Sequence, residues 1–283
     1  MKRHCFRAGT AAAVAGLALL CAGCQLSADV IGKGLNIVRG GAAALKDFSW
    51  EEELEIGGTV AAQLTSEREI VKDEGAIRYV NLVALTVSNF NKRPEVQPRV
   101  LILRDDQPNA FACPGGYMFV TTGLVRLCQD ESELAGVISH EVTHVALKHT
   151  LIRLKKDRKF AFAGTTIKEL TPEQYKEAAV AFNGSIGASI KTIAMNNYGQ
   201  EYEAEADRVG AECAAAAGYD GAGLARLIDR LPEKSGERGW KEFSKYPDGS
   251  TRAQKIMQNL TKIGPGGATN AERFRRELAA VSK

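Results

Sequence analysis

The sequence predicts an α+β fold, predominantly helical, with a small β-sheet flanking one central helix. Apolar residues recur at three- and four-residue steps within 51–91 and again within 123–146, which is the spacing of helices with one buried face. Two short runs, 99–103 and 116–121, combine branched and aromatic residues in the manner of strands. Many helices beside few strands favour a helical domain built on a small sheet.

The N-terminal residues 1–23 are expected to be a targeting segment that is absent from the mature fold. Basic residues within 2–7 precede an apolar run at 11–20 that is short for a helix spanning a bilayer. The segment ends in Cys-Ala-Gly-Cys24, which resembles the end of a bacterial lipoprotein signal, where the last cysteine is lipidated and begins the mature chain. Cys21 stands where such signals usually carry Leu, so ordinary secretory cleavage nearby and an uncleaved anchor remain alternatives.

This interpretation makes residues 24–50 a lipid-anchored tether and assigns the protein to the bacterial cell envelope. Gln25 after the lipidated cysteine, in place of Asp, indicates the periplasmic face of the outer membrane in a Gram-negative cell. The acyl chains, rather than a transmembrane helix, would then attach the protein to the membrane. Removal of residues 1–23 takes away three positive charges and no negative ones, so the formal net charge falls from +3 to zero. A chain without net charge gives no electrostatic basis for binding nucleic acid.

The mature chain is expected to hold one domain, 51–263, followed by a flexible C-terminal tail with a short helix, 264–283. In chain order, the domain begins with two helices and continues through the two strands, which are separated by a loop at 105–109. A helix that begins near Gly123 then leads into the central helix. The Gly-rich stretch 182–187 is a candidate hinge for a lid.

Besides Cys24, the mature chain contains three cysteines: Cys113, Cys128 and Cys213. No pair of them has a Cys-x-x-Cys spacing, so a cysteine-based zinc site is not expected. Export permits one disulfide, most simply Cys113–Cys128. Buried thiols that act as small apolar side chains are the alternative.

The central helix carries a His-Glu-x-x-His motif, His140-Glu-Val-Thr-His144. Histidines four residues apart lie on one face of a helix, one turn from each other, so both imidazoles can bind a single zinc ion. Glu141 then projects beside the ion as a candidate general base. Asp130 followed by Glu133 resembles a capping box at the start of this helix. The alternative is a buried helix whose histidines only satisfy hydrogen bonds.

A zinc hydrolase needs a third protein ligand and one open position, and the acidic stretch 198–207 offers the ligand. Glu203 and Asp207 lie one turn apart on one helical face, which makes Glu203 the candidate ligand. Asp207 would accept the outer N–H of a ligand histidine, most simply His140, and fix its tautomer. Glu205 is the alternative ligand, and a solvated acidic face is the ordinary alternative for the whole stretch. The three candidate ligands, His140, His144 and Glu203, predict one zinc ion (Zn2+) per chain.

Three separated stretches, 109–124, 133–144 and 203–210, together resemble the M48 zinc peptidases. These are the gluzincins that include HtpX-like, Oma-like and CaaX prenyl proteases. The order of the three stretches is specific, and the resemblance covers roughly residues 50–260. It implies the zincin fold, metalloendopeptidase activity and Glu203 as the third ligand. Without multiple membrane spans or a helical-repeat tail, the chain looks most like the compact lipoprotein-type members.

The resemblance also implies that the second strand lies along the active-site cleft and pairs with the backbone of a bound substrate. The residues concerned are Gly116, Tyr117, Met118, Phe119 and Val120. An extended, unfolded segment would fit such a strand better than a folded protein would.

The chain departs from the family pattern near the expected site. Many members carry a His-Pro pair in a nearby loop, where this chain has Tyr246-Pro247. Tyr246 and Tyr198 are the candidate hydrogen-bond donors to the oxyanion, with a plain surface tyrosine as the alternative at position 246. Gly199-Gln200 stands where Ser-Arg is usual. His149, five residues beyond His144, is rotated off the ligand face and is not expected to bind the metal.

These expectations combine into a zinc-dependent endopeptidase of the bacterial cell envelope that hydrolyses peptide bonds in unfolded or misassembled proteins. The alternative is a non-catalytic zinc-binding lipoprotein that acts as an assembly factor or chaperone-like scaffold, an idea motivated by the missing loop histidine. The presence of Glu141 favours the enzyme, because a protein that only binds its clients needs no general base.

Overall fold

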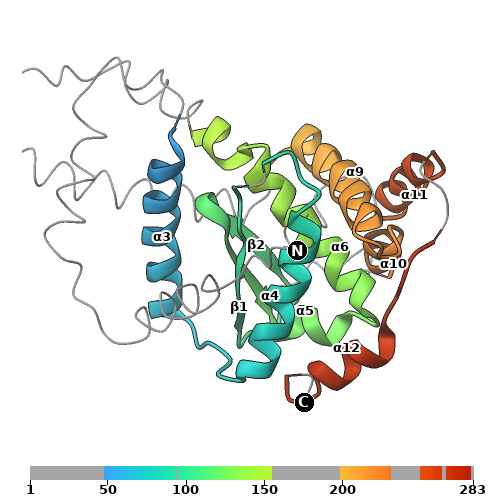
Figure 1. Cartoon of the computed structure of the whole chain (residues 1–283), viewed down its shortest axis with the longest axis horizontal. Coiled ribbons are helices and arrows are strands. Elements are labelled where there is room, and N and C mark those ends of the chain that lie inside the picture. The colour runs from blue at the N-terminus through green and yellow to red at the C-terminus, as the bar shows by residue number, and fades with distance from the viewer. Residues whose placement is uncertain (1–47, 94, 155–197, 231–248, 263–265, 282–283) are drawn as a thin grey trace, which may run out of the picture. The chain divides into compact units, whose positions relative to one another are not determined.

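The computed structural model describes residues 48–93, 95–154, 198–230, 249–262 and 266–281, which form helices around a three-stranded sheet (Figure 1). The sheet is preceded by two helices, α3 (Trp50–Glu67) and α4 (Glu74–Ser88). It consists of β1 (Arg99–Leu103), β2 (Ala110–Cys113) and β3 (Tyr117–Thr121), with a 3-10 turn, η2 (Pro114–Gly116), between the last two. The helices that follow are α5 (Thr122–Leu127), α6 (Glu131–Ala146), α9 (Gln200–Ala216), α10 (Gly223–Asp229), α11 (Gly249–Leu260) and α12 (Ala271–Glu277).

The expected fold class is confirmed, because the described residues are mainly helical and a small mixed sheet flanks the central helix α6. β1 has the predicted limits, and two helices fill the stretch 51–91 as predicted. α3 begins at a capping box, in which Ser49 Oγ accepts the N–H of Glu52 at 3.2 Å and the Glu52 carboxylate accepts the N–H of Ser49 at 2.7 Å.

Two local features differ from the prediction. Residues Ala110–Cys113 form the strand β2, although their Ala-Phe-Ala-Cys sequence has no β-branched residue. Gly116 lies in η2 with a φ of +84°, so the next strand begins at Tyr117. The helix expected near Gly123 is present as α5, which leads through the extended Cys128 (φ −64°, ψ 134°) into α6 and its N-cap Asp130, as predicted.

β3 is the central strand of the sheet, with β1 parallel on one side and β2 antiparallel on the other. The outer edge of β1 is bonded to the segment before α4. There Val71 N–H donates to the carbonyl of Ile102 at 2.9 Å, and Arg104 N–H donates to the carbonyl of Glu69 at 2.8 Å. Both sides of β3 and the outer edge of β1 are therefore occupied.

The outer edge of β2 has no strand partner among the described residues. At the start of β2, Thr121 N–H donates to the carbonyl of Asn109 at 2.9 Å, which makes 109 and 121 a hydrogen-bonded pair. Main-chain groups alternate in direction along a strand, so Ala110 and Ala112 point theirs away from β3. This edge of β2 is the one left for an added strand in the part of the chain that the structure describes.

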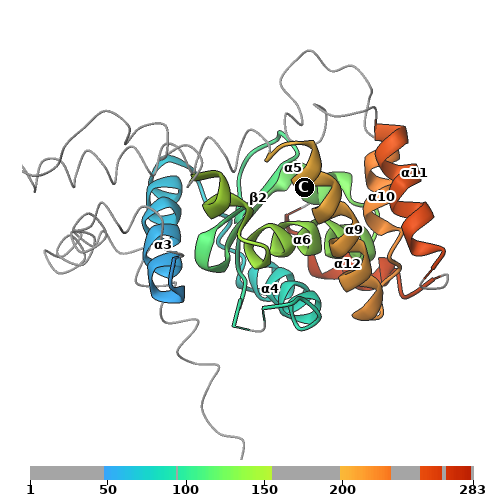
Figure 2. The same ribbon diagram turned by 90° about the horizontal axis from the view of Figure 1, so that it is seen from above.

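Different helices lie on the two sides of the sheet, with α3 on one side and α6 on the other (Figures 1 and 2). Alternate strand residues such as Val100, Ile102 and Val120 join the core that α4 and α6 also form. Every residue of α6 is buried. The helix is thus enclosed all round, and its motif lies inside the protein.

The C-terminal residues are not a separate flexible tail as expected, because those described at 266–281 pack on the domain. Phe274, Leu278 and Val281 belong to the core. Thr269 accepts the N–H at the start of α6 with its carbonyl at 3.0 Å, and Arg273 forms an ion pair with the buried Glu131. Apolar burial and this ion pair together attach α12 to the start of α6.

Several predictions concern residues outside the described ones: the targeting segment 1–23 with Cys24, the candidate hinge 182–187 and Tyr246. The limits of the expected domain, 51–263, therefore remain predictions. None of the described helices has both the length and the apolar character needed to cross a bilayer.

The expected disulfide is wrong, because Cys113, Cys128 and Cys213 are free thiols. All are buried, and burial raises the pKa of the Cys113 thiol to about 12. Burial raises the pKa of Cys128 well above its usual value in the same way. The alternative interpretation holds: these thiols are small apolar side chains in the packing.

Arg273→Ala is expected to lower the free energy of unfolding by about 1–3 kcal/mol, because the carboxylate of Glu131 would stay buried without its cation. Arg276→Ala is the matched control on the same helix. Its side chain is 70% exposed and pairs with the neighbouring Glu277, so its loss should cost less than about 0.5 kcal/mol. Urea unfolding of the purified protein at pH 7 measures both.

The difference between wild type and Arg273→Ala should shrink in acid. Burial raises the pKa of Glu131, but hydrogen bonds from Arg273 and Tyr79 outweigh burial and leave the pKa below its usual value. Such a carboxyl stabilises the fold above its unfolded-state pKa of about 4.3, and that contribution is lost as the pH falls through the folded-state pKa. A difference that stays constant between pH 7 and pH 3 would contradict this role.

Candidate metal centre

α6 is fixed at its start by its own acidic residues. Asp130 Oδ1 accepts the N–H of Glu133 at 3.0 Å, as in a capping box. The Glu133 carboxylate accepts the N–H of Gln129 at 2.8 Å rather than that of Asp130, so the second bond of the box is shifted by one residue. From this start the helix carries His140 and His144, one turn apart, into the interior.

α9 lies against α6 at close range. A Cβ on Gly210 would lie 2.8 Å from the main-chain nitrogen of His140, so glycine is required at this contact. Across the same interface, Ser139 Oγ donates to the carbonyl of Gly210 at 2.7 Å. This packing brings the buried carboxylates of Glu203 and Asp207 to the histidines.

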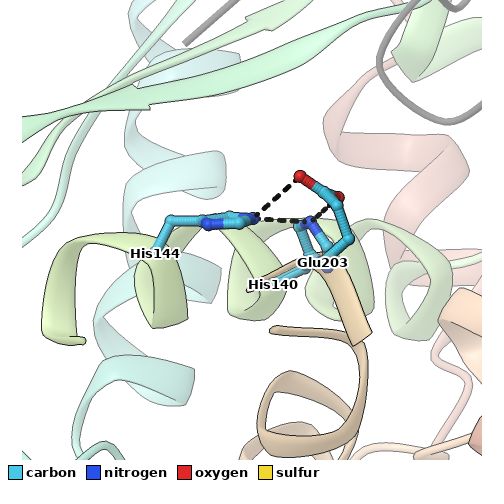
Figure 3. Close-up of side chains that lie close together, drawn as sticks. All are labelled: His140, His144 and Glu203. Atoms are coloured by element: carbon cyan, nitrogen blue, oxygen red, sulfur yellow. Dashed lines mark hydrogen bonds and ion pairs between the residues drawn. The ribbon is translucent and has the colours of Figure 1, made fainter. Parts of the chain in front are cut away.

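The side chains of His140, His144 and Glu203 point toward one another (Figure 3). The two Nε2 atoms are 3.0 Å apart, and Glu203 Oε2 and Oε1 lie 3.4 Å and 3.8 Å from those of His140 and His144, respectively. Tetrahedral ligands at about 2.0–2.1 Å from a zinc ion are about 3.3 Å apart, so these atoms fit one ion. Glu203 Oε2 is buried and lacks a well-aligned hydrogen-bond partner among the described residues, as expected of an atom that a metal would satisfy.

The electrostatics of this group favour a cation. Burial lowers the pKa of His140, but Asp207 and Glu203 outweigh burial and raise the pKa to about 10. A proton or a metal ion is therefore favoured between His140 and the carboxylates. Burial and the charges of neighbouring histidines lower the pKa of His144 well below its usual value, so this ring is neutral, as a metal ligand must be.

Asp207 lies where the prediction requires it, with Oδ1 3.0 Å from Nδ1 of His140. The sequence interpretation did not include its second partner, the buried Arg252 of α11, which donates to the two Asp207 oxygens at 2.9 Å and 2.7 Å. Burial raises the pKa of Asp207, but the charge of Arg252 and the contact with His140 outweigh burial and lower the pKa to about 2. Asp207 is thus an ionised acceptor for the outer nitrogen of His140.

His144 has a different outer partner, His149. The two Nδ1 atoms are 2.8 Å apart, and Nε2 of His149 lies 3.5 Å from Oε2 of Glu205. Neither His149 nor Glu205 joins the ligand group that the structure brings together. Glu205, the alternative ligand in the sequence, therefore faces His149 instead of the metal position.

Tyr198 touches the centre through its ring, its backbone and its hydroxyl. The ring stacks on His144 with centroids 3.9 Å apart, and the main-chain N–H donates to Glu203 Oε1 at 3.1 Å. The hydroxyl lies 3.0 Å from Thr150 Oγ1 and donates to the carbonyl of Ala112 at 3.4 Å. These contacts position two of the candidate metal ligands, His144 and Glu203. A role as oxyanion donor stays a prediction, as it does for Tyr246 outside the described residues.

Glu141 is buried next to the ligand group. Burial raises its pKa to about 8, helped by Glu203 and opposed by the charge of His140 and a hydrogen bond from the Ala112 N–H. A raised pKa makes a carboxylate a stronger base near neutral pH, and a bound dication would favour its ionised form. Glu141 thus has the surroundings of a general base.

The predicted substrate strand needs a correction. Residues 117–120 are in β3, whose two sides are already paired with β1 and β2, so β3 cannot add a substrate strand. Gly116 precedes the strand, and Met118, Phe119 and Val120 are buried. The outer edge of β2 is next to the site, because β2 packs on α6 and the Ala112 carbonyl accepts from Tyr198, whose ring stacks on His144. The prediction missed this because it did not recognise β2 as a strand.

Residues 72–260, more than half of the chain, match the model of peptidase family M48. The chain belongs to peptidase family M48. The matched range contains the whole ligand group and Arg252 of this M48 chain.

Three Escherichia coli proteins illustrate the relatives of this M48 chain. Beta-barrel assembly-enhancing protease is 24% identical over 200 residues, which cover 69% of this chain and 40% of that protein. Metalloprotease YcaL is 26% identical over 255 residues (88% and 95%), and metalloprotease LoiP is 29% identical over 200 residues (68% and 73%). The chain thus spans less than half the length of the assembly-enhancing protease and matches nearly all of YcaL.

Asp207→Ala is expected to weaken zinc binding by about 10–100-fold, because His140 would lose the acceptor that fixes its tautomer. Glu212→Ala is the matched control on the same helix, since Glu212 forms an exposed pair with Arg208. Competition with a chromophoric chelator measures both affinities, and circular dichroism checks the fold. Equal affinities for the two variants would refute the assigned role of Asp207.

Proposed function

We propose that this protein is a zinc-dependent endopeptidase of the bacterial cell envelope that cleaves unfolded or misassembled proteins. The observation that carries the proposal is the buried group of His140, His144 and Glu203, whose ligand atoms lie within 4.8 Å of one another, with Glu141 beside it. The M48 membership supports the reaction class. A binding site alone would not require a buried carboxylate with a raised pKa in this position.

His140, His144 and Glu203 would hold one zinc ion and leave a position open for water and substrate. When bound, the ion supplies Lewis acidity, which lowers the pKa of a water molecule and polarises the peptide carbonyl. Glu141 accepts the proton of the attacking water and returns it to the leaving amine. Asp207 and Arg252 hold His140 in the tautomer that directs Nε2 to the metal.

The substrate backbone would add to the outer edge of β2 and not to β3. Ala110 and Ala112 direct their main-chain groups to that edge, and a substrate strand that reached Ala112 would replace the Tyr198 hydroxyl on the Ala112 carbonyl. A segment that adds as a strand must be extended and must have its own backbone groups free. Unfolded or misassembled polypeptides meet this condition better than folded ones, which supports the proposed substrate class.

An envelope location rests on the lipoprotein-like end of the targeting segment at Cys24, with residues 24–50 as the tether. Lipid on Cys24 would attach the enzyme to the periplasmic face of the outer membrane. The name of the beta-barrel assembly-enhancing protease says that this relative enhances the assembly of β-barrels. A substrate class shared with that relative would then be β-barrel proteins that fail to assemble.

Glu141→Gln is expected to reduce casein cleavage at least about 100-fold while zinc content and fold are retained, because the general base is lost and the ligands are not. Glu201→Gln, an exposed position on α9, is the control and should keep full activity. Cleavage of casein by the purified protein, with zinc measured on each sample, tests both. Substantial residual cleavage by Glu141→Gln would reject the assigned base. Zinc without cleavage in the wild type would favour the scaffold alternative.

Tyr198→Phe is expected to leave kcat nearly unchanged, because the ring would still stack on His144 and the lost hydroxyl is engaged with Thr150 and Ala112. KM should fall or stay equal, since the carbonyl of Ala112 would be free to accept an N–H from substrate. Steady-state cleavage of a fluorogenic peptide separates the two constants. A drop in kcat of about 100-fold or more would instead identify the hydroxyl as the oxyanion donor.

A further inference from the structure

We propose that His149 is a positioning residue that holds His144 in its metal-binding tautomer and is itself held by Glu205. The proposal depends on the metal centre proposed above. The observation that supports it is the contact between two buried imidazoles, those of His144 and His149. Nδ1 of His149 lies 2.8 Å from Nδ1 of His144, and both rings are about 1% exposed. The spacing is that of a hydrogen bond, so one of these nitrogens donates and the other accepts.

The direction of the bond follows from the position of the ligand group. Nε2 of His144 faces His140 and Glu203, so a metal ion there takes the lone pair of Nε2 and the proton of His144 is on Nδ1. His144 Nδ1–H therefore donates to Nδ1 of His149. His149 can accept only if its own proton is on Nε2, and that nitrogen faces Oε2 of Glu205 at 3.5 Å. The whole chain of contacts thus admits one arrangement of protons.

The backbone explains why a histidine five positions after a ligand reaches that ligand. On a continuous helix, position 149 would be rotated well away from position 144. α6 ends at Ala146, however, and Lys148 has a φ of +59°, a left-handed conformation that turns the chain back. The Lys148 ammonium group is held 2.7 Å from Oε1 of the buried Glu53. This turn returns His149 to the outer side of His144.

The surrounding side chains hold both rings in place. Tyr198 stacks on His144 at 3.9 Å between centroids, and Tyr202 lies against His149 at 4.7 Å. His149 thus faces His144, Glu205 and two aromatic rings. Imidazole rings packed in this way lose the freedom to flip, so Nε2 of His144 stays directed at the ligand group and Nδ1 at His149.

The two metal-binding histidines are supported by partners of different charge. His140 faces the ionised Asp207, which needs the buried Arg252 as its counterion. His144 faces a neutral imidazole, and the carboxylate at the end of that chain, Glu205, is 43% exposed. Water stabilises Glu205 there, so the second support adds no unpaired charge to the interior.

Substitutions at position 149 separate positioning from simple packing. In His149→Asn the side-chain oxygen can accept at the place of Nδ1, so the full-length protein should bind zinc within a few-fold of wild type. His149→Leu fills similar volume without an acceptor and should bind zinc about 10–100-fold more weakly. Glu205→Gln keeps an acceptor at a half-exposed position and should bind zinc like wild type. Chelator competition gives the affinities. Equal affinities for His149→Leu and wild type would overturn the proposal.

The proton positions can be read directly, without any variant of the site. The chain has four histidines, and three of them are His140, His144 and His149. Long-range proton–nitrogen spectra of the zinc-loaded, histidine-labelled protein should show His144 protonated on Nδ1 and His149 protonated on Nε2. In a protein that keeps residues 1–23, His4→Gln identifies the signal of the remaining histidine. A His149 protonated on Nδ1, or on both nitrogens, would overturn the proposal even if His149→Leu failed to fold.

Failure of this proposal and failure of the peptidase proposal are distinguishable. The expected tautomers and zinc affinities in a protein that cleaves no casein would reject the peptidase function and leave the role of His149 intact. Casein cleavage by a protein with the other His149 tautomer would reject the role of His149 and leave the peptidase function intact.

Discussion

The close contact between α6 and α9 is the constraint on which the rest of the site depends. The histidines belong to one helix and their acidic partners to the other, so the site exists only at this interhelical distance. Gly210 makes the distance possible, because a Cβ there would lie 2.8 Å from the backbone of His140. The Ser139 hydroxyl bonds across the same contact to the carbonyl of Gly210. A wider spacing here would lengthen the contacts of Glu203 with both histidines and the contact of Asp207 with His140.

A helix that is buried along its whole length needs partners for its charged end. The three acids at the start of α6 each have an arginine from a later element: Asp130 has Arg226 and Glu133 has Arg230, both near α10, and Glu131 has Arg273 of α12. These acids also suit the positive end of the helix dipole. The later segments therefore pack around the start of α6, which explains why residues 266–281 are docked on the domain.

Features encoded by local spacing were predictable from the sequence, and features that depend on tertiary contacts were not. The two histidines, the limits of β1 and the pair Glu203–Asp207 follow from helix and strand periods within a few residues. β2 lacks branched residues and is a strand because β3 lies beside it. Arg252 is 45 residues from Asp207, a separation that carries no periodic signal. The position of His149 beside His144 depends on the left-handed turn at Lys148, which follows the end of α6 and which helical spacing does not predict.

The buried charges of the centre favour the binding of a divalent cation. The centre holds three buried carboxylates, those of Glu141, Glu203 and Asp207, and one buried guanidinium among the described residues, that of Arg252, which faces Glu203 and Asp207. Buried charge without a counter-charge is costly, so this group favours protonated forms. Burial raises the pKa of Glu141 to about 8. The carboxylates of Asp207 and Glu203 raise the pKa of His140 to about 10 despite its burial. A bound dication would supply the two missing positive charges and replace both protons. Glu141 would then be ionised, so the charge balance that favours a metal would also prepare the proposed general base.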